Sequence, residues 1–293
     1  MELRVLRYFL ALAREETISG AAESLHLSQP TLSRQLMDLE AELGKALFIR
    51  GKRKIALTEE GMLLRKRAQE ILDLVDKSEA EFLAMDEIVS GDVYIGGGET
   101  YALRVIANAI KDFQSEHPQV KFHLFSCNAE DVTDRLDKGL IDFGVLIEPA
   151  SVVKYESMRL PDVDTWGVLM RRDAPFAERD AIAPEDLWGL PLICSIQTLE
   201  GNEISGWMRR DYEKLNIVAT YNLVYNASLL VQEGIGYALC LDGIVNASGD
   251  SPLLFKPLEP RLEARLDIVW KKYQVFSKAA RLFLTGLQRR LAG

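Results

Sequence analysis

The sequence predicts a mixed α/β protein in which a small helical part comes first and a larger α/β part follows. Three observations support this fold class. Apolar residues recur at helical spacing through most of the first 90 residues, with one hairpin pattern among them. From residue 91 onward, short apolar runs alternate with amphipathic segments, as in proteins built on a parallel sheet. Between them, the Ser-Gly-Asp sequence at 90–92 breaks the helical pattern and marks the boundary.

The first 45 residues predict three helices, of which the first is amphipathic. Ser19 is expected to cap a short second helix, in which Ala21 and Ala22 face inward and let another helix approach closely. Ser28 can cap the third helix, and Pro30 suits its first turn, where a missing N–H costs nothing. The apolar stripe of this third helix consists of Leu32, Leu36, Leu39 and Leu43. Two short helices, a tight turn and a third helix with a polar outer face form a helix-turn-helix.

The outer face of the third helix carries groups suited to the base edges of DNA. Pro30, Ser33, Arg34 and Met37 lie opposite the apolar stripe, at ~100° per residue. With Gln29 from the first turn, this face offers a hydroxyl, a guanidinium and an amide, which match the donors and acceptors of a major groove. An ordinary amphipathic helix with a solvated face would carry the same pattern, so the neighbouring sequence has to decide.

A basic hairpin is expected directly after this helix. Apolar runs at 47–49 and 55–57 flank a turn that contains Gly51, which is the pattern of a two-stranded wing. Residues 45–54 hold five basic side chains and no acidic one. A charge run is usually a solvated surface, but beside a recognition helix it is better explained as a phosphate clamp.

The charge of the chain is uneven. Its 293 residues have a formal net charge of −9, which by itself argues against a nucleic-acid partner. Residues 1–66, however, carry 11 Lys and Arg against 9 Asp and Glu, whereas the remainder carries 24 against 35. The end that carries the helix-turn-helix is therefore the basic end.

Composition also narrows the location and the chemistry. No apolar run approaches the ~18 residues that would span a membrane, and residues 1–4 lack the apolar core of a signal peptide, so a cytoplasmic protein is expected. The three cysteines and three histidines lack metal-ligand spacing, and we expect no metal, no cofactor and no disulfide framework. Because no P-loop, GxGxxG motif or Ser-His-Asp arrangement can be assembled, an enzyme is not expected.

Thr58 is expected to cap a long helix over residues 59–89, with Glu59 and Glu60 near the positive end of its dipole. Small or apolar side chains follow a heptad spacing along it: Leu64, Ala68, Ile71, Val75, Ser78, Phe82, Met85 and Val89. A helix of about 30 residues is marginal without a partner. The stripe could pack on the C-terminal part of its own chain, but we favour pairing with a second subunit.

The second part alternates strands and helices. Strands are expected at 93–96, 120–125, 141–147, 165–170, 191–194, 217–224, 234–240 and 266–270. Helices are expected at 102–116, 131–139, 229–233 and 277–291. The run at 141–147 is almost continuously apolar, as in a parallel sheet that is covered on both faces.

Spaced motifs in both parts resemble the LysR-type transcriptional regulators. In the first part they lie at residues 9–13, 21–25, 28–33, 39–44, 47–50 and 57–61, and looser ones follow at 113–118, 139–144, 184–187, 191–193 and 234–236. The resemblance implies a winged helix-turn-helix DNA-binding domain over 1–58, a linker and dimerisation helix over 59–89, and an effector-binding domain over 91–293. The last would have two α/β lobes, similar to a periplasmic binding protein, joined by two crossing strands. Lobe 1 would cover about 91–160 and 266–293, and lobe 2 about 161–265.

The resemblance also implies a DNA partner and an oligomer. Carried over to this chain, Gln29, Pro30, Ser33 and Arg34 would face the bases, while Thr31 and Arg53 would face the backbone. We add Arg50 and Lys52 from the basic hairpin. A homodimer or homotetramer would then bind an imperfect inverted repeat.

A small-molecule effector is expected between the lobes, where strands end. Gly98 and Thr100 precede a helix whose first N–H groups, with the Thr100 hydroxyl, could bind a carboxylate, although the same pattern also describes a plain helix cap. The charge of Glu99 would oppose an anion unless it points away. The candidate effector residues are Gly98, Thr100, Tyr101, Ser126, Asn128, Glu148, Ser195 and Asn226.

Two other readings of the chain stay open. A redox-responsive regulator could use Cys127 and Cys194, which are expected at cleft edges in opposite lobes, but neither has an adjacent base in sequence to lower its pKa. A solute-binding protein without a regulatory role would not need the first 90 residues.

Overall fold

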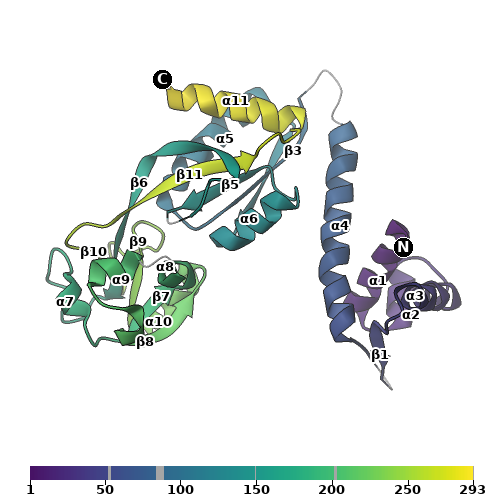
Figure 1. Ribbon diagram of the computed structural model, residues 1–293, viewed down its shortest axis with the longest axis horizontal. Helices are drawn as coiled ribbons and strands as arrows, with labels where there is room; N and C mark the ends of the chain where they lie inside the picture. Colours follow the sequence, from purple (N-terminus) through teal and green to yellow (C-terminus); the bar gives the residue numbers. More distant parts are fainter. Residues whose placement is uncertain (52–53, 84–88, 149, 201–202, 293) are drawn as a thin grey trace. The chain divides into compact units, whose positions relative to one another are not determined.

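The computed structural model describes residues 1–51, 54–83, 89–148, 150–200 and 203–292 (Figure 1). The chain divides into two compact units, Met1–Leu83 and Ala84–Gly293. Within the described part, no helix combines the length and the apolar character that crossing a bilayer requires.

The first unit has the predicted order of helices, hairpin and long helix. Its elements are α1 (Leu3–Glu15), α2 (Ile18–Ser24), α3 (Gln29–Leu43), β1 (Phe48–Arg50), β2 (Ile55–Leu57) and α4 (Glu59–Leu83). As predicted, Ser28 caps α3, because its Oγ accepts a 3.4 Å hydrogen bond from the N–H of Thr31. Gly44 ends α3 in the left-handed region, at φ +65°, where a glycine carries no Cβ penalty.

The cap of the second helix is not the predicted one. Thr17, not Ser19, occupies the N-cap position, and its Oγ1 accepts from the N–H of Gly20 at 3.1 Å. Helix α2 therefore already begins at Ile18. Ala21 and Ala22 are buried as predicted, which leaves room for the neighbouring helices to approach.

The core of the first unit lies between α1, α2 and α3. Leu32, Leu36 and Leu39 are fully buried against Phe9 of α1, as the stripe predicts. The fourth member of that stripe, Leu43, is 40% exposed because it lies in the last turn, beyond the end of this core.

Helix α4 packs partly on α1. Thr58 caps it as predicted, accepting from the N–H of Gly61 at 2.9 Å. Ala68 and Leu72 are buried against Leu6 of α1. The early part of the predicted heptad stripe is thus covered within its own unit. Among the described side chains of α4, Met62, Leu63 and Leu74 are the exposed large apolar ones. The expected continuation over 84–88 lies outside the described residues.

The second unit consists of two α/β lobes. Lobe 1 contains β3 (Gly91–Gly97), η1 (Tyr101–Leu103), α5 (Arg104–Glu116), β4 (Val120–Ser126), α6 (Ala129–Asp137), β5 (Phe143–Ile147) and α11 (Lys278–Ala292). Lobe 2 contains α7 (Pro184–Leu187), β7 (Leu192–Ser195), α8 (Ile196–Glu200), α9 (Glu203–Met208), η2 (Tyr212–Lys214), β8 (Ile217–Tyr221), α10 (Val224–Gln232), β9 (Tyr237–Leu241) and β10 (Leu253–Pro257).

Two long strands, β6 (Tyr155–Arg171) and β11 (Glu263–Lys271), connect the lobes (Figure 1). The first residues of β6 pair with β11 in lobe 1, and its last residues pair with β9 and β10 in lobe 2. The strand order is β4-β3-β5-β11-β6-β9-β7-β8, with β10 added on β6. In each lobe the three remaining strands are parallel: β4, β3 and β5 in lobe 1, and β8, β7 and β9 in lobe 2.

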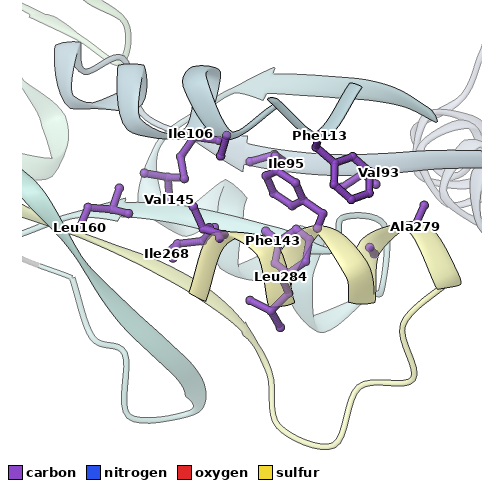
Figure 2. Packing of buried hydrophobic residues seen from close by; sticks show 14 of the residues in the cluster. Val93, Ile95, Ile106, Phe113, Phe143, Val145, Leu160, Ile268, Ala279 and Leu284 are labelled. Carbon is purple, nitrogen blue, oxygen red and sulfur yellow. The ribbon is translucent and has the colours of Figure 1, made fainter. Parts of the chain in front are cut away.

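The lobe 1 sheet is covered on both faces, as the apolar run at 141–147 predicts. On one face, Val93, Ile95 and Phe143 pack against α5 and α11 (Figure 2). On the other face, Val132 and Leu136 of α6 pack against the sheet. This burial fixes the strand ends that carry the loops described next.

Some expected elements differ. The strand expected over 217–224 ends at Tyr221, and Val224 begins α10, which replaces the shorter helix expected at 229–233. Strand β10 and helices α8 and α9 were not predicted, and β6 is 17 residues long rather than a short strand of lobe 2.

Candidate functional site

The polar face of α3 is open to solvent. Gln29, Pro30, Thr31 and Arg34 are exposed, and Ser33 is half-buried. The Thr31 Oγ1 lies 2.8 Å from the Ser28 Oγ, so the capping hydroxyl of Ser28 is linked to the hydroxyl of Thr31. Among the described residues, the Arg34 guanidinium has no hydrogen-bond or ion-pair partner. This face therefore presents an unpaired cation, an amide and a hydroxyl, held on one capped helix.

The hairpin beside α3 is only partly within the described residues. Lys52 and Arg53 lie outside them, and Arg50 ends strand β1 with its side chain outside the description. The two described lysines are paired with acids of neighbouring elements: Lys54 Nζ with Glu16, and Lys45 Nζ with Glu60 at 3.7 Å. The predicted phosphate clamp thus depends on Arg50, Lys52 and Arg53.

A cavity of about 60 Å³ lies between the two lobes, where the carboxyl ends of the parallel strands meet. The strand ends of β3, β4 and β5 line it from lobe 1, and those of β7, β8 and β9 line it from lobe 2. Four predicted effector residues line this cavity: Gly98, Asn128, Glu148 and Ser195.

Three other predicted residues lie in a neighbouring hollow of about 400 Å³ on the lobe 1 side. Thr100, Tyr101 and Ser126 line this second hollow, together with Gly98. Asn226 lines neither space, because it lies on an exposed part of α10, within the first turn of that helix. This position on a helix, outside both spaces, does not support the prediction of Asn226 as an effector residue.

The start of η1 does bind a carboxylate, but the carboxylate belongs to the chain itself. The Thr100 hydroxyl donates to Asp164 Oδ2, and the N–H of Ala102 donates to Asp164 Oδ1 at 3.3 Å. The prediction of free donors at this helix start is thus wrong for both groups. Burial raises the pKa of Asp164 above its ordinary value, although the bonds from Thr100 and Ala102 act in the opposite direction.

Glu99 reaches across the cleft. Its Oε2 accepts a 2.6 Å hydrogen bond from the N–H of Val224, the first residue of α10. The residue before it, Leu223, provides no side-chain cap, so Glu99 of lobe 1 takes over this role for a helix of lobe 2.

Gln197 makes the reciprocal contact from lobe 2. Its Oε1 accepts from the N–H of Ala129, the first residue of α6, at 3.4 Å, and its Nε2 donates to the carbonyl of Ile147 at 3.2 Å. Each lobe therefore places one side-chain acceptor at the N-terminus of a helix in the other lobe.

Glu148 belongs to an ionic group on the lobe 1 side. Arg159 contacts Glu148 Oε1 at 2.7 Å and donates from Nε to Asp267 at 2.9 Å. The hydrogen bond with Glu148 is the main cause that raises the pKa of Arg159. The charge of Glu148 is therefore compensated at the cavity wall.

Of the two cysteines in the redox hypothesis, only Cys127 lies at the cavity as predicted. Cys127 and Cys240 line the cavity, whereas Cys194 is fully buried in the core of lobe 2. Burial raises the pKa of Cys127, and it raises the pKa of Cys194 and of Cys240 to about 12. Such thiols are mostly protonated at neutral pH, which disfavours attack on an oxidant.

Several cavity residues were missed by sequence reasoning. Trp166, Tyr221, Asn222 and Cys240 all line the cavity. Asn222 directly follows the end of β8, a position that the strand misassignment over 217–224 concealed. Trp166 was not predicted because the sequence pattern at 165–170 indicates only a short strand of lobe 2, and not the long strand that crosses between the lobes. Within the described part of the chain, no cluster of three potential metal ligands occurs.

Comparisons with known proteins agree for both units. The family model "LysR substrate binding domain" matches residues 87–292, and "Bacterial regulatory helix-turn-helix protein, lysR family" matches residues 3–62. The Hca operon transcriptional activator HcaR of Escherichia coli (strain K12) is 28% identical over 298 residues, which cover 100% of this chain and 99% of HcaR.

A partial relative and a solved structure extend this picture. The hydrogen peroxide-inducible genes activator of Pectobacterium carotovorum subsp. carotovorum is 31% identical over 193 residues, or 66% of this chain and 64% of that protein. The crystal structure of full-length CbnR complexed with its target DNA has a TM-score of 0.75 at 20% identity and covers 99% of both chains.

The predicted resemblance and the predicted fold class are therefore confirmed. Because one model spans most of the second unit and the other spans the helix-turn-helix, this chain belongs to the LysR family of transcriptional regulators, with an N-terminal DNA-binding part and a C-terminal effector-binding domain.

Proposed function

We propose that α3 reads base edges of duplex DNA through its exposed polar face, and that a small effector held between the lobes changes this binding. The observation that carries the first half is the position of Arg34, exposed on α3 and without a partner among the described residues. In a major groove, a bidentate arginine contact to guanine is worth ~1–3 kcal/mol of base discrimination. Gln29, Pro30 and Ser33 would join Arg34 at the bases.

Backbone contacts would position this reading helix. Thr31, Arg50, Lys52 and Arg53 are the proposed phosphate partners. The cluster of basic residues in the hairpin supports this assignment. Contacts to phosphates supply most of the sequence-independent affinity for DNA and make that affinity salt-dependent. CbnR, whose structure is similar to that of this chain, was crystallised in complex with its target DNA, which supports the same use of this fold.

The effector would bind in the inter-lobe cavity, with Gly98, Asn128, Glu148 and Ser195 as its contacts. The neighbouring hollow, with Thr100, Tyr101 and Ser126, is the place where a larger ligand would extend. A ligand that binds the open and closed arrangements of the lobes with different affinity shifts the population between them. We propose that this shift alters how paired subunits present their reading helices.

Pairing is proposed through α4, with a homodimer or homotetramer on an imperfect inverted repeat. The exposed Met62, Leu63 and Leu74 provide the apolar surface for it, since part of the predicted stripe is already used by α1. The same function places the protein in the cytoplasm, where the DNA is, and gives it no catalytic role.

The experiment that tests this proposal is retention of genomic fragments by the full-length protein at low and raised salt, followed by sequencing. Salt-sensitive retention of a small set of related fragments is expected, and Arg34→Ala should lose that set. Retention of no duplex, or an unchanged set with Arg34→Ala, would overturn the DNA half. Ser195→Phe, which fills the cavity, should keep DNA retention and lose any effector response.

A further inference from the structure

The cavity between the lobes is acidic. Glu99 and Glu148 line it, and no Lys, Arg or His occurs among its described lining residues. Arg159 compensates Glu148 at 2.7 Å, whereas Glu99 has no cationic partner among the residues that the structure describes. A ligand carboxylate beside Glu99 would meet like charge in a space that is partly shielded from water, which raises the cost of binding it.

Three backbone donors around the cleft, each at the start of a helical element, are used by the chain itself. Glu99 accepts from the first N–H of α10, and Gln197 accepts from the first N–H of α6. At the start of η1, Asp164 accepts from Ala102. An anion would have to displace one of these acceptors before it gained a hydrogen bond at any of these three positions.

A buried donor, in contrast, is left over. Trp166 lines the cavity and is only 4% exposed, and its indole Nε1 has no hydrogen-bond partner in the described part of the chain. A buried N–H without an acceptor is unfavourable, and an oxygen atom brought within hydrogen-bond distance of Nε1 would relieve this. On the acidic side, the Oε1 atom of Glu99 has no hydrogen-bond partner among the described residues, and the bond from Val224 uses Oε2.

We infer that the cleft takes a small primary amine that also carries an acceptor oxygen, with its ammonium on Glu99 and its oxygen on the Trp166 indole. This inference rests on the proposed effector function of the same cleft. An ammonium has three donors and can bond to Glu99 Oε1 while Oε2 stays on Val224. Such a ligand strengthens the contact between the lobes rather than breaking it, which gives it the differential affinity that a population shift requires.

The test uses three probes of similar size on the full-length protein: ethanolamine, ethylene glycol and glycolate. They share a hydroxyl and differ in the charge of the other end. Binding is followed through the indole N–H signals of the isotope-labelled protein, in which Trp166→Phe identifies the signal of Trp166. Saturable movement of that signal is expected with ethanolamine, and little movement with the other two at equal concentration.

Two variants distinguish a direct contact between Glu99 and the ammonium from a general effect of the protein's negative charge. Glu99→Gln should weaken ethanolamine binding by about tenfold, as expected when a charge-assisted hydrogen bond is replaced by a neutral one. Glu130→Gln removes the same charge from an exposed position at the start of α6 and should leave the affinity unchanged. Equal affinity in wild type and Glu99→Gln would overturn the inference.

The remaining outcomes distinguish this inference from the proposed function. Tighter binding of glycolate than of ethanolamine at Trp166 would contradict the inference that the ligand is an amine, but it would still support the cleft as the effector site. A Trp166 signal that responds to none of the probes would also overturn the amine. DNA retention, measured on the same sample, reports separately on the regulator function, since it depends on α3 and not on this cavity.

Discussion

The carboxylate of Glu99 caps helix α10 from the opposite lobe, with 2.6 Å between its Oε2 and the N–H of Val224. Gln197 contacts the start of α6 in the reverse direction, because its Oε1 in lobe 2 accepts from the N–H of Ala129 in lobe 1. Helix N-termini attract negative charge and acceptors because their first N–H groups have no partner within the helix. The closure of the lobes is therefore coupled to the integrity of two helix starts.

This coupling predicts a local effect of truncating Glu99. In Glu99→Ala, the N–H of Val224 loses its acceptor, and its amide exchange should accelerate by about tenfold, which corresponds to ~1.4 kcal/mol. Gln197→Ala is the matched variant, and it should accelerate exchange at Ala129 while leaving Val224 slow. The measurement is residue-resolved hydrogen exchange of the full chain. Equal exchange at Val224 in wild type and Glu99→Ala would show that this bond does not hold the helix start.

The local elements of the fold could largely be predicted from the sequence. The Ser28 cap, the Thr58 cap and the buried stripe around Leu32 follow from spacing and side-chain chemistry within a few residues, and the structure confirms them. Thr17 was missed because two hydroxyl residues, Thr17 and Ser19, stand near the same helix start, and only the backbone conformation selects between them.

The site was less predictable, because its chemistry depends on contacts far apart in sequence. The local sequence predicts that the donors near Thr100 bind a carboxylate. The carboxylate that they bind belongs to Asp164, on a strand more than sixty residues later in the chain. The same applies to Glu99: the local sequence indicates only a negative charge that opposes an anion, whereas in the fold its carboxylate accepts from the N–H of Val224. The local sequence indicates which polar groups need a hydrogen-bond partner, and only the tertiary structure shows which residue provides it.

Asp164 predicts a dependence of stability on pH. Its folded pKa is raised above the ordinary 3.8, so between these values the folded chain binds more protons than the unfolded chain. The contribution of Asp164 to stability should therefore increase as the pH falls through its folded pKa, and level off below 3.8. The effector domain contains all four tryptophans, so denaturant unfolding followed by their fluorescence measures it selectively.

The comparison for Asp164 is with Asp164→Asn, because other carboxylates titrate in the same range. Wild type should gain stability relative to Asp164→Asn as the pH is lowered from neutral. A constant difference between the two proteins across this range, or a difference of the opposite sign, would contradict the raised pKa.

The thiols predict a protein that resists mild oxidation. With burial raising the pKa of Cys127, and raising that of Cys194 and Cys240 to about 12, the reactive thiolate is scarce at neutral pH. Thiol titration of the native protein before and after mild peroxide should give the same value, while unfolding in denaturant should release all three thiols. Rapid loss of two native thiols would instead favour the redox alternative.

The observed cap of α2 predicts that substitutions of Thr17 and Ser19 differ in their effect on stability. Thr17→Ala should destabilise the helix-turn-helix by about 1 kcal/mol, because it removes the N-cap acceptor for Gly20. Ser19→Ala should have much less effect, since Ser19 lies inside α2 and is not its cap. Hydrogen exchange of the α2 amides in the full chain measures both, and equal effects of the two substitutions would contradict the assigned cap.

Arg34 predicts how specificity and salt dependence separate. Arg34→Ala should weaken binding to a selected DNA fragment by ~1–3 kcal/mol, which is the value of one bidentate base contact. The affinity for that fragment should then be close to the affinity for unrelated duplex DNA. Because a base contact is not a phosphate contact, the slope of log affinity against log salt should change little. Arg14→Ala is the matched control, since Arg14 is also an exposed arginine but pairs with Glu15 at 2.9 Å on α1. Fluorescence anisotropy across a salt series checks both quantities. Uniform weakening on all sequences with a shallower slope would instead assign Arg34 to the phosphate backbone.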